Sequence, residues 1–261
     1  LCAGRCPISA LRAREGQGLD RGVWAELGDA GLFTLITDGF GRAEAALVFE
    51  ELGRGLVPGP LVWTHLASGL GLDPGRVVGG VVASGVGAVS APVIVEHLSD
   101  LDDLLVVGDD GVRRVDPASL EGDEVDPLDP LTPVWVVPSL PDGEMVGGPE
   151  AAREAMVEGA AVVAAQLAGM ASALVDLTVA YTSERKQFGR PVGSFQALKH
   201  MMADMLTRAE LARTQAYAAA AWLDDPSLGL PDRAVSAAKV VAGDAAIHNG
   251  RDSVQAHGGM G

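Results

Sequence analysis

From Glu150 to Ser183 the chain reads EAAREAMVEGAAVVAAQLAGMASALVDLTVAYTS. Ala, Val, Leu and Met make up 21 of these 34 residues, which predicts one long helix. Its uncharged centre, Gly159–Val175, is marginal as a membrane span and is flanked by Glu158 and Asp176. Such a helix is more typical of a buried position in a helical bundle.

Two more long helices follow this one. In the first, apolar residues recur in steps of three and four: Leu198, Met202, Met205, Ala209, Ala212 and Ala216. Ser194 is the predicted N-cap of that helix, and Asp232 is the predicted N-cap of the next. The last helix runs to about His257, where Gly258-Gly259 stops it. Long helices joined by short loops predict an antiparallel bundle, with the periodic Met and Ala residues in its core.

Residues 1 to about 72 carry shorter helical patterns. Asp20 is the expected N-cap of a helix that reaches Leu32, and Arg42–Leu56 forms a second amphipathic helix. Pro58-Gly59-Pro60 ends the second helix, because proline cannot continue a helix and disfavours helix before itself. Leu61–Leu70 is a third, apolar helix.

Residues 75–149 have a different pattern, in which short valine-rich runs alternate with turn residues. Asp109-Asp110-Gly111 predicts a hairpin between the runs Leu104–Val107 and Val112–Val115. The proline-rich stretch Pro127–Pro130 predicts a loop. This segment is therefore interpreted as a small antiparallel β-domain.

The whole chain is thus predicted to be an α+β protein with three domains. They are an N-terminal helical domain (1–74), a small antiparallel β middle domain (75–149) and a C-terminal antiparallel helix bundle (150–261). The composition agrees, because 48% of the 261 residues are apolar but only 4% are aromatic, which favours close-packed helices over an aromatic-rich sandwich.

Charge and cysteine content exclude several classes of function. The net charge is -16, and such a surface repels nucleic-acid phosphates and anionic lipid headgroups, so neither nucleic acid nor membrane is an expected partner. The two cysteines, Cys2 and Cys6, are too few for a disulfide scaffold and lack neighbours for a zinc site, so no metal is expected. With no apolar signal-peptide segment at its start, the chain is expected in the reducing cytoplasm.

Two motifs flank the last two long helices. The first is Arg185-Lys-Gln-Phe-Gly-Arg-Pro191, followed by Phe195-Gln196, and the second is Gln255-Ala-His-Gly-Gly-Met-Gly261. In this order and spacing they resemble the acyl-CoA dehydrogenase family, whose members carry Arg-x-Gln-Phe-Gly-x-Pro, Phe-Gln and Gln-x-x-Gly-Gly-x-Gly motifs. The helix–sheet–helix order of the chain also matches the architecture of that family.

The resemblance implies that these motifs bind the FAD of a neighbouring subunit. The residues so implied are Arg185, Gln187, Phe188, Gln196, Gln255, Gly258 and Gly259. The residue types suit this role, because a guanidinium can clasp a diphosphate through two hydrogen bonds and glycines let backbone N–H groups approach a cofactor closely. Two alternatives stay open: Arg185 could be a surface ion-pair partner of Glu184 or Asp176, and Gly258-Gly259 could be only a helix stop.

Other parts of a family flavin site are not found in the sequence. The Thr-Glu-Pro-x-x-Gly-Ser and Trp-x-x-Thr segments of many β-domains have no counterpart in residues 75–149; Trp135 lacks the following Thr, and Trp63 is interpreted as core. The catalytic Glu lies in some members on a helix beyond the position of Gly261 and in others at the position of Gly159. Glu158 is the neighbouring candidate base, although adjacent helix positions point about 100° apart. Its alternative role is a helix-start charge near the positive end of the helix dipole.

The activity implied by the resemblance is α,β-desaturation of an acyl-CoA thioester, in fatty-acid or steroid catabolism. A carboxylate removes the α-proton, hydride passes from the β-carbon to the flavin, and hydrogen bonds to the thioester carbonyl stabilise the developing enolate. Electron-transfer flavoprotein is the expected electron acceptor. Because the acidic surface repels anionic CoA at long range, a CoA site would need a local positive patch.

A chain with contacts to a neighbour's flavin, but without those that hold its own, predicts a subunit of a hetero-oligomer. It would complete the flavin site of a second acyl-CoA dehydrogenase subunit. The alternatives are a non-catalytic structural subunit that stabilises a catalytic partner, and a self-sufficient homo-oligomeric acyl-CoA dehydrogenase.

Overall fold

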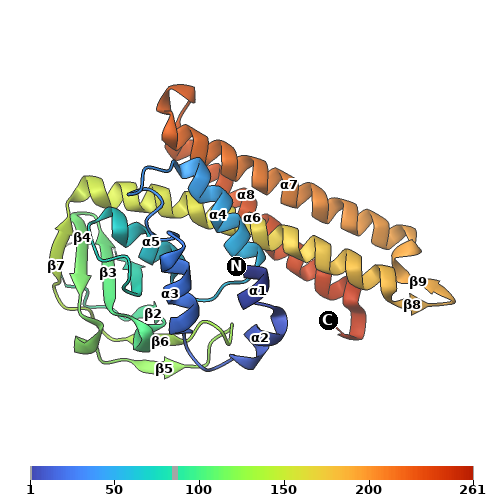
Figure 1. The fold of residues 1–261 in the computed structure, drawn as a ribbon, viewed down its shortest axis with the longest axis horizontal. Helices are drawn as coiled ribbons and strands as arrows, with labels where there is room; N and C mark the ends of the chain where they lie inside the picture. The colour runs from blue at the N-terminus through green and yellow to red at the C-terminus, as the bar shows by residue number, and fades with distance from the viewer. Residues whose placement is uncertain (1, 84–87, 261) are drawn as a thin grey trace. The chain divides into compact units, whose positions relative to one another are not determined.

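The computed structural model describes residues 2–83 and 88–260, and these form two compact units (Figure 1). The first unit comprises residues 3–40 and 58–159, and the second comprises residues 41–57 and 160–261. Helix α6 (Pro149–Glu184) contributes its first part to one unit and the rest to the other. The α+β fold class predicted from the sequence is confirmed, whereas the division at residues 74 and 149 stays a prediction.

The first unit begins with three short helices, α1 (Cys2–Arg5), α2 (Ile8–Ala13) and α3 (Arg21–Asp29). Residues 41–57 belong to the second unit, and the next helix of the first unit is α5 (Leu61–Gly69). Asp20 is the N-cap of α3 as predicted, and its carboxylate accepts the backbone N–H groups of Gly22 and Val23 at 2.9 and 3.1 Å. These backbone bonds, that of Val23 above all, lower the pKa of Asp20. The helix ends at Asp29, earlier than the predicted Leu32.

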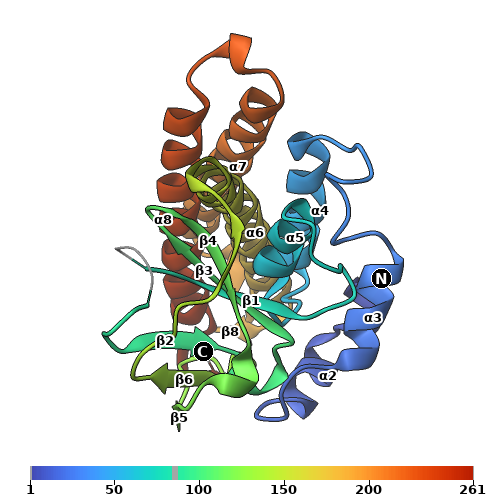
Figure 2. The ribbon, with the colours of Figure 1, turned by 90° about the vertical axis from the view of Figure 1, so that its left-hand side faces the viewer.

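Two small sheets complete the first unit (Figure 2). One has the strand order β1 (Val78–Val82), β3 (Asp103–Gly108), β4 (Gly111–Val115), β7 (Glu144–Gly147), and the other has the order β2 (Val93–Glu96), β6 (Val134–Val137), β5 (Asp123–Val125). The β3–β4 hairpin and the loop at residues 127–130 are confirmed. One pair departs from the antiparallel prediction: β1 and β3 are parallel. Between them the chain leaves for the second sheet, so β3 re-enters in the direction of β1.

The core of this unit lies between α5 and the first sheet, where Val78, Leu105 and Val107 are buried with Ala67. A buried threonine joins the two layers. The hydroxyl of Thr64 accepts the N–H of Val78 at 2.9 Å and donates to its carbonyl at 3.1 Å, so one side chain satisfies both backbone groups of the strand residue.

The second unit is a helical bundle made of α4 (Arg42–Arg54), most of α6, α7 (Gln196–Asp224) and α8 (Pro231–His257). Its core is built largely from alanine. The buried alanines on the three long helices include Ala164, Ala168, Ala171, Ala209, Ala212, Ala216, Ala238, Ala242 and Ala245. Met205 and the alanines predicted for the core of α7 are indeed buried, whereas Leu198 and Met202 are only half-buried.

Both predicted N-caps of the long helices were wrong. Phe195 is the N-cap of α7, and the Ser194 hydroxyl instead donates to the carbonyl of Pro191 at 2.7 Å. Helix α8 starts at Pro231, so Asp232 is already inside its first turn. Proline is well suited to that first position because its fixed φ is helical and its missing N–H needs no partner. The predicted stop is confirmed: Gly258 follows α8 with φ of 63°, a value that favours glycine.

By length and composition α6 is apolar enough to cross a membrane, but the core helix of a soluble protein meets the same criteria. Within the second unit the helix packs against protein: the side chain of Asn249, which is itself fully buried, donates to the carbonyl of Ala171 on α6 at 3.0 Å, and Thr178 on α6 donates to Ser253 on α8 at 2.9 Å. These contacts agree with a buried bundle helix.

Helices α4 and α6 touch through their backbones at two glycines. A Cβ placed on Gly53 would lie 1.9 Å from the carbonyl oxygen of Gln166, and one on Gly169 would lie 1.9 Å from that of Glu50. Both distances are far below any real contact, so neither position has room for a side chain. Each glycine therefore fixes how closely the two helices approach.

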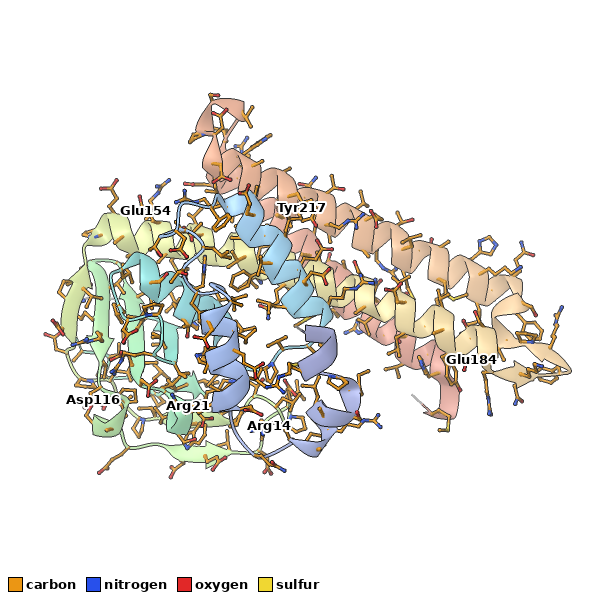
Figure 3. All side chains as sticks on the ribbon, viewed as in Figure 1. Arg14, Arg21, Asp116, Glu154, Glu184 and Tyr217 are labelled. Carbon is orange, nitrogen blue, oxygen red and sulfur yellow. The ribbon has the colours of Figure 1, made fainter. Side chains whose placement is uncertain are left out.

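Polar groups hold α4 against the other bundle helices. The Tyr217 hydroxyl on α7 donates to the buried carboxylate of Glu50, where α7 passes α4 (Figure 3). Burial, together with this carboxylate, raises the pKa of Tyr217 to about 12. At the other end of α4, Asp224 accepts the N–H groups of Arg42 and Ala43 at 2.8 and 2.9 Å. A residue at the end of α7 therefore caps the start of α4.

We expect Gly53→Ala and Gly169→Ala each to lower the free energy of unfolding by about 1–3 kcal/mol or more, because each added methyl group must push a backbone aside. Urea denaturation followed by circular dichroism measures the effect. Gly69→Ala is the matched control, since a Cβ there meets nothing within 4 Å. If the bundle variants were as stable as this control, the close crossing of α4 and α6 would be wrong.

A buried histidine lies beside β2 in the first unit. His97 is 2% exposed, has φ of 56°, and its Nδ1 has no hydrogen-bond partner among the described residues. Burial lowers the pKa of His97 below its usual 6.5, although nearby Asp100 and Asp129 oppose the shift. The unfolded chain therefore binds a proton more readily than the folded one. The stability that this neutral histidine gives is complete above pH 6.5 and is lost as the pH falls below it.

His97→Asn should make stability less dependent on pH, because asparagine tolerates the same backbone conformation but does not titrate. The measurement is the loss of unfolding free energy between pH 7.5 and pH 5.5, compared between the variant and the natural chain. A smaller loss in the variant is expected. Equal losses would mean that His97 does not titrate differently in the folded and unfolded states.

Candidate functional site

A two-residue hairpin lies between α6 and α7. Its strands are β8 (Lys186–Gln187) and β9 (Arg190–Pro191), and its turn is Phe188-Gly189. Both turn residues have positive φ, 52° and 79°, as expected of the tight turns that match the twist of a hairpin. A positive φ is rare for phenylalanine, so the surroundings must hold this turn in place.

Phe195 supplies that support. Its ring meets Phe188 edge-on at 6.1 Å between centroids, and the guanidinium of Arg190 lies 4.0 Å above it. The hairpin is thereby folded onto the residue that starts α7. Apart from this edge contact the Phe188 side chain is open to solvent, and the residue is 91% exposed.

Arg185 joins α6 to this hairpin through its backbone. The backbone N–H of Arg185 donates to the carbonyl of Tyr181 at 2.9 Å, and the carbonyl of Arg185 accepts the backbone N–H of Val192 at 2.8 Å. The side chain is exposed and has no ion-pair partner within residues 2–83 and 88–260. Asp176, one of its two suggested partners, pairs with Arg54 instead. The guanidinium is thus available for a ligand.

The second motif forms the end of α8 and the turn after it. Gln255 is exposed, and a side chain placed on Gly258 or Gly259 would meet nothing within 4 Å. Gly258 is required by its backbone conformation, whereas Gly259 only leaves open space above its backbone. Gly261 lies outside the described residues.

Stacked rings bring the two motifs to the same end of the bundle. Tyr181 near the end of α6 and His257 at the end of α8 have ring centroids 4.1 Å apart, and the Tyr181 hydroxyl donates to the His257 carbonyl at 3.3 Å. Figure 1 shows β8, β9 and the end of the chain at this end. Gln196 starts α7 beside the hairpin, exposed and 3.3 Å from the ring of His200.

Positive charge gathers here in a chain of net charge -16. The exposed cationic side chains between the end of α6 and the first turns of α7 are Arg185, Lys186, Arg190 and Lys199. This is the kind of local patch that an anionic ligand would need. The acidic composition predicted the need for such a patch, but Lys186, Arg190 and Lys199 were not predicted as its members, nor was Tyr181 predicted to join the motifs.

Glu158 belongs to the first unit and lies near His65. Its carboxylate is 3.2 Å from the Nε2 of His65, whose side chain is fully buried. Because α6 starts at Pro149, Glu158 is well inside the helix, and its interpretation as a helix-start charge was wrong. Gly159, the position of the base in some family members, faces Leu66, 3.1 Å from where a Cβ would lie.

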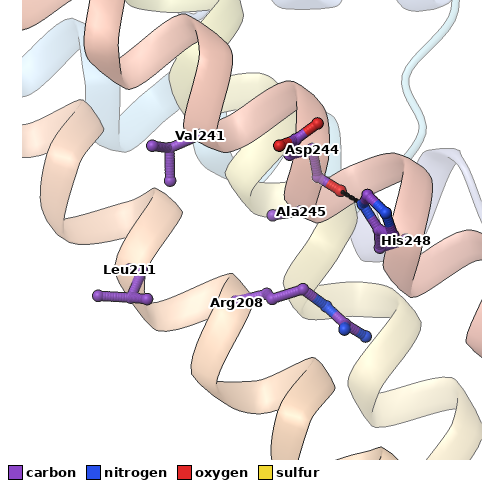
Figure 4. Close-up of a pocket in the computed structure, with 6 residues that line it drawn as sticks. All are labelled: Arg208, Leu211, Val241, Asp244, Ala245 and His248. Atoms are coloured by element: carbon purple, nitrogen blue, oxygen red, sulfur yellow. Dashed lines mark hydrogen bonds between the residues drawn. The ribbon is translucent and has the colours of Figure 1, made fainter.

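A shallow groove crosses the second unit between α7 and α8 (Figure 4). It has a volume of about 310 Å³ and is lined by Arg208, Leu211, Val241, Asp244, Ala245 and His248. None of the residues predicted to contact a flavin lines this groove. Arg208 donates to the side-chain oxygen of Asn249 at 2.9 Å and forms an ion pair with Asp252, so its charge is neutralised within the bundle.

The sequence matches known proteins along nearly its whole length. Residues 147–261 match the family model for the C-terminal domain of acyl-CoA dehydrogenases. Acyl-CoA dehydrogenase IpdE2 of Mycolicibacterium smegmatis is 33% identical over 97% of this chain and 81% of its own length, and IpdE2 of Mycobacterium tuberculosis is 31% identical over 99% and 81%. This chain belongs to the acyl-CoA dehydrogenase family.

Solved structures of acyl-CoA dehydrogenases share the fold. A Tcur3481–Tcur3483 steroid ACAD variant superposes with a TM-score of 0.82 at 24% identity, covering 99% of this chain and 84% of that one. The ChsE4–ChsE5 complex from Mycobacterium tuberculosis gives a TM-score of 0.80 at 23% identity, covering 98% and 83%.

The acyl-CoA dehydrogenase family implies FAD, and the exposed residues at the end of the bundle fit it. They supply an available guanidinium, exposed amide side chains and an open glycine turn, which together suit a diphosphate and a polar ring system. They are exposed, and none of them lines the groove between α7 and α8, as expected of contacts to a neighbour's cofactor. Trp63, by contrast, is partly buried and packs against the core of the first unit and on Gly80, where a Cβ would lie 2.3 Å from its ring.

Glu158→Ala should lower the free energy of unfolding by about 1–3 kcal/mol, because it removes the carboxylate beside a buried imidazole. Glu158→Gln should cost less, since an amide oxygen can still accept from His65. Thermal or urea unfolding of both variants checks this order. Equal stability of the natural chain and Glu158→Ala would show that the contact to His65 contributes nothing.

Proposed function

We propose that this chain is a subunit of an FAD-dependent acyl-CoA dehydrogenase and contributes contacts to a flavin held by a partner subunit. The observation that supports this most directly is the outward display of the implied flavin contacts at one end of the bundle. Arg185 has an exposed, unpaired guanidinium among the described residues, and Phe188 is 91% exposed. The hydrated guanidinium is available to an anionic ligand, and the Phe188 ring offers apolar surface that a partner can cover.

The individual roles follow from the chemistry of each group. Arg185 would clasp the diphosphate through parallel N–H donors. Gly258 and Gly259 would let backbone N–H groups approach the cofactor, while Gln187, Gln196 and Gln255 would donate or accept at its polar edges. Phe188 would exclude water from the contact.

FAD, when bound, supplies the acceptor for the hydride in the α,β-desaturation of an acyl-CoA thioester. The residues of this chain bind and orient: Tyr181 and Phe195 hold the two motifs in place, and the cationic patch attracts phosphate groups. A catalytic base is not assigned, because the Glu158 carboxylate already lies beside the buried His65.

A hetero-oligomer with a second acyl-CoA dehydrogenase subunit is the proposed assembly. Two solved relatives of the same fold, the ChsE4–ChsE5 complex and the Tcur3481–Tcur3483 protein, carry paired names, and the latter is called a steroid ACAD. The name steroid ACAD supports a steroid-derived or other bulky acyl group as substrate. The cytoplasm as location and electron-transfer flavoprotein as electron acceptor are also part of the proposal, and they follow from the cysteine content and from the family. The alternatives are a non-catalytic structural subunit and a self-sufficient homo-oligomer.

Visible absorbance separates the self-sufficient homo-oligomer from the other two functions. The chain purified alone should be colourless, and the complex formed on co-expression with a second acyl-CoA dehydrogenase subunit should carry about one flavin per pair of chains. One flavin per chain in the lone protein would contradict the proposal and favour the homo-oligomer.

Arg185→Ala should weaken flavin binding by the complex about 10- to 100-fold, the usual cost of a lost charge-assisted hydrogen bond to an anion. Flavin release during dialysis, measured by fluorescence, reports the loss. Lys186→Ala removes a neighbouring exposed charge and is the control for general electrostatics. Unchanged flavin binding in Arg185→Ala, with the complex intact, would leave only the structural-subunit function.

A further inference from the structure

A pocket of about 270 Å³ lies among the short helices that begin the first unit, and we call it the α2–α3 pocket. Its lining residues come from α1, α2, α3, the loop before α3 and Pro58, all within the first unit. Most of its wall is apolar. The buried side chains that line it are Cys6, Leu11, Leu19, Trp24 and Leu27. No residue implied in flavin binding lines it, so the flavin contacts do not explain this pocket.

One polar group in the wall of the α2–α3 pocket is left unsatisfied by the fold. Trp24 is 3% exposed, and its indole Nε1–H has no hydrogen-bond partner within residues 2–83 and 88–260. A buried donor without an acceptor lowers stability, and buried tryptophans usually donate this N–H to an oxygen. The unpaired donor of Trp24 is therefore an exception that needs a reason.

The packing of the Trp24 ring shows which part of it meets the pocket. Phe33 covers one face, with the ring centroids 4.7 Å apart and the ring planes at 30°. Gly59 covers the edge at Cε3 and Cζ3, because a Cβ on this glycine would lie 2.6 Å from Cζ3. In an indole, Nε1 lies on the opposite edge. With one face and one edge covered, Trp24 meets the pocket with its other face and its N–H edge.

Two arginines border the α2–α3 pocket, but their charges are matched. Arg14 forms an ion pair with Asp20 at 3.0 Å, and the Nε of Arg5 donates to the carboxylate of Glu26 at 2.7 Å. A charged ligand would have to separate one of these pairs and then lose its own hydration in an apolar wall. The pocket therefore favours an uncharged ligand.

We propose that the α2–α3 pocket binds a small, uncharged and largely apolar molecule with a carbonyl oxygen, which accepts the indole N–H of Trp24. An apolar wall with few, well-placed polar groups is typical of small-molecule sites. The volume lies just below the range of about 300–1,000 Å³ that holds drug-sized ligands, so the occupant is a compact ketone or ester and not a nucleotide cofactor. This site is independent of the flavin-binding proposal.

A matched pair of ligands tests the role of the N–H. The ketone α-tetralone and the hydrocarbon tetralin share one two-ring skeleton and differ in a single carbonyl oxygen. The ketone should bind about 10-fold more tightly, because tetralin leaves the buried donor unpaired. Nuclear magnetic resonance of the four tryptophan indole N–H groups follows the binding. The Trp24 signal, identified by its loss in Trp24→Phe, should move downfield with the ketone and far less with the hydrocarbon.

Three variants locate the effect. Trp24→Phe keeps an aromatic ring but removes the donor, so the affinities for the two ligands should come within about 2-fold of each other. Trp63→Phe is the matched control, since Trp63 belongs to the same unit but does not line the pocket, and the preference for the ketone should persist. Ala10→Phe adds a ring from a half-buried position in the pocket wall and should weaken binding of both ligands. Circular dichroism verifies that each variant is folded.

Three results would each overturn the proposal. They are the binding of neither ligand, equal affinities of the natural chain for both, and a preference for the ketone that survives Trp24→Phe. A ketone that shifts another indole signal but leaves that of Trp24 in place would do the same. None of these measurements involves flavin or a partner subunit, so their outcome is distinguishable from a failure of the proposed function.

Discussion

The second unit depends on backbone contact between α4 and α6 at Gly53 and Gly169. Because no side chain separates the helices there, α4 comes close enough for Glu50 to bind Tyr217 and for Asp224 to cap the first turn of α4. Small residues have the same effect among the three long helices, whose alanine-filled core leaves little room for adjustment. The helices are therefore held rigidly, and their ends can present ligand-binding groups with fixed geometry.

Rigid helices explain how a hairpin and a glycine turn, some seventy residues apart in sequence, can act as one site. Tyr181 joins α6 to α8 at the level where both motifs begin, and Phe195 holds the hairpin turn in a conformation that phenylalanine rarely adopts. The groups that would touch a cofactor are themselves almost free of contacts. Their positions are set by Tyr181 and Phe195, which lie behind them and support them. This is a common way to build a surface that another molecule completes.

Much of the fold could be predicted from sequence, because each long helix has its own apolar period and the β3–β4 hairpin has its own turn residues. The errors occurred where the deciding partner is distant or where two residue types compete. Helix α8 starts at Pro231, so Asp232 lies inside its first turn and does not cap it. The parallel pairing of β1 with β3 depends on the path of the chain through a second sheet between them. The motifs identified the candidate site, but only the folded structure shows that Asp176 forms an ion pair with Arg54 and that Glu158 lies beside His65.

The cap on α4 has a consequence for how this protein is made. Helix α4 leaves the ribosome early, but Asp224, which satisfies its first N–H groups, follows 182 residues after Arg42. Tyr217, which satisfies Glu50, is 167 residues away from it. During synthesis the apolar side of α4 therefore stays in contact with water until α7 has emerged. Such long-range closure slows folding and exposes an aggregation-prone surface, so the nascent chain should depend on chaperones until α7 is complete.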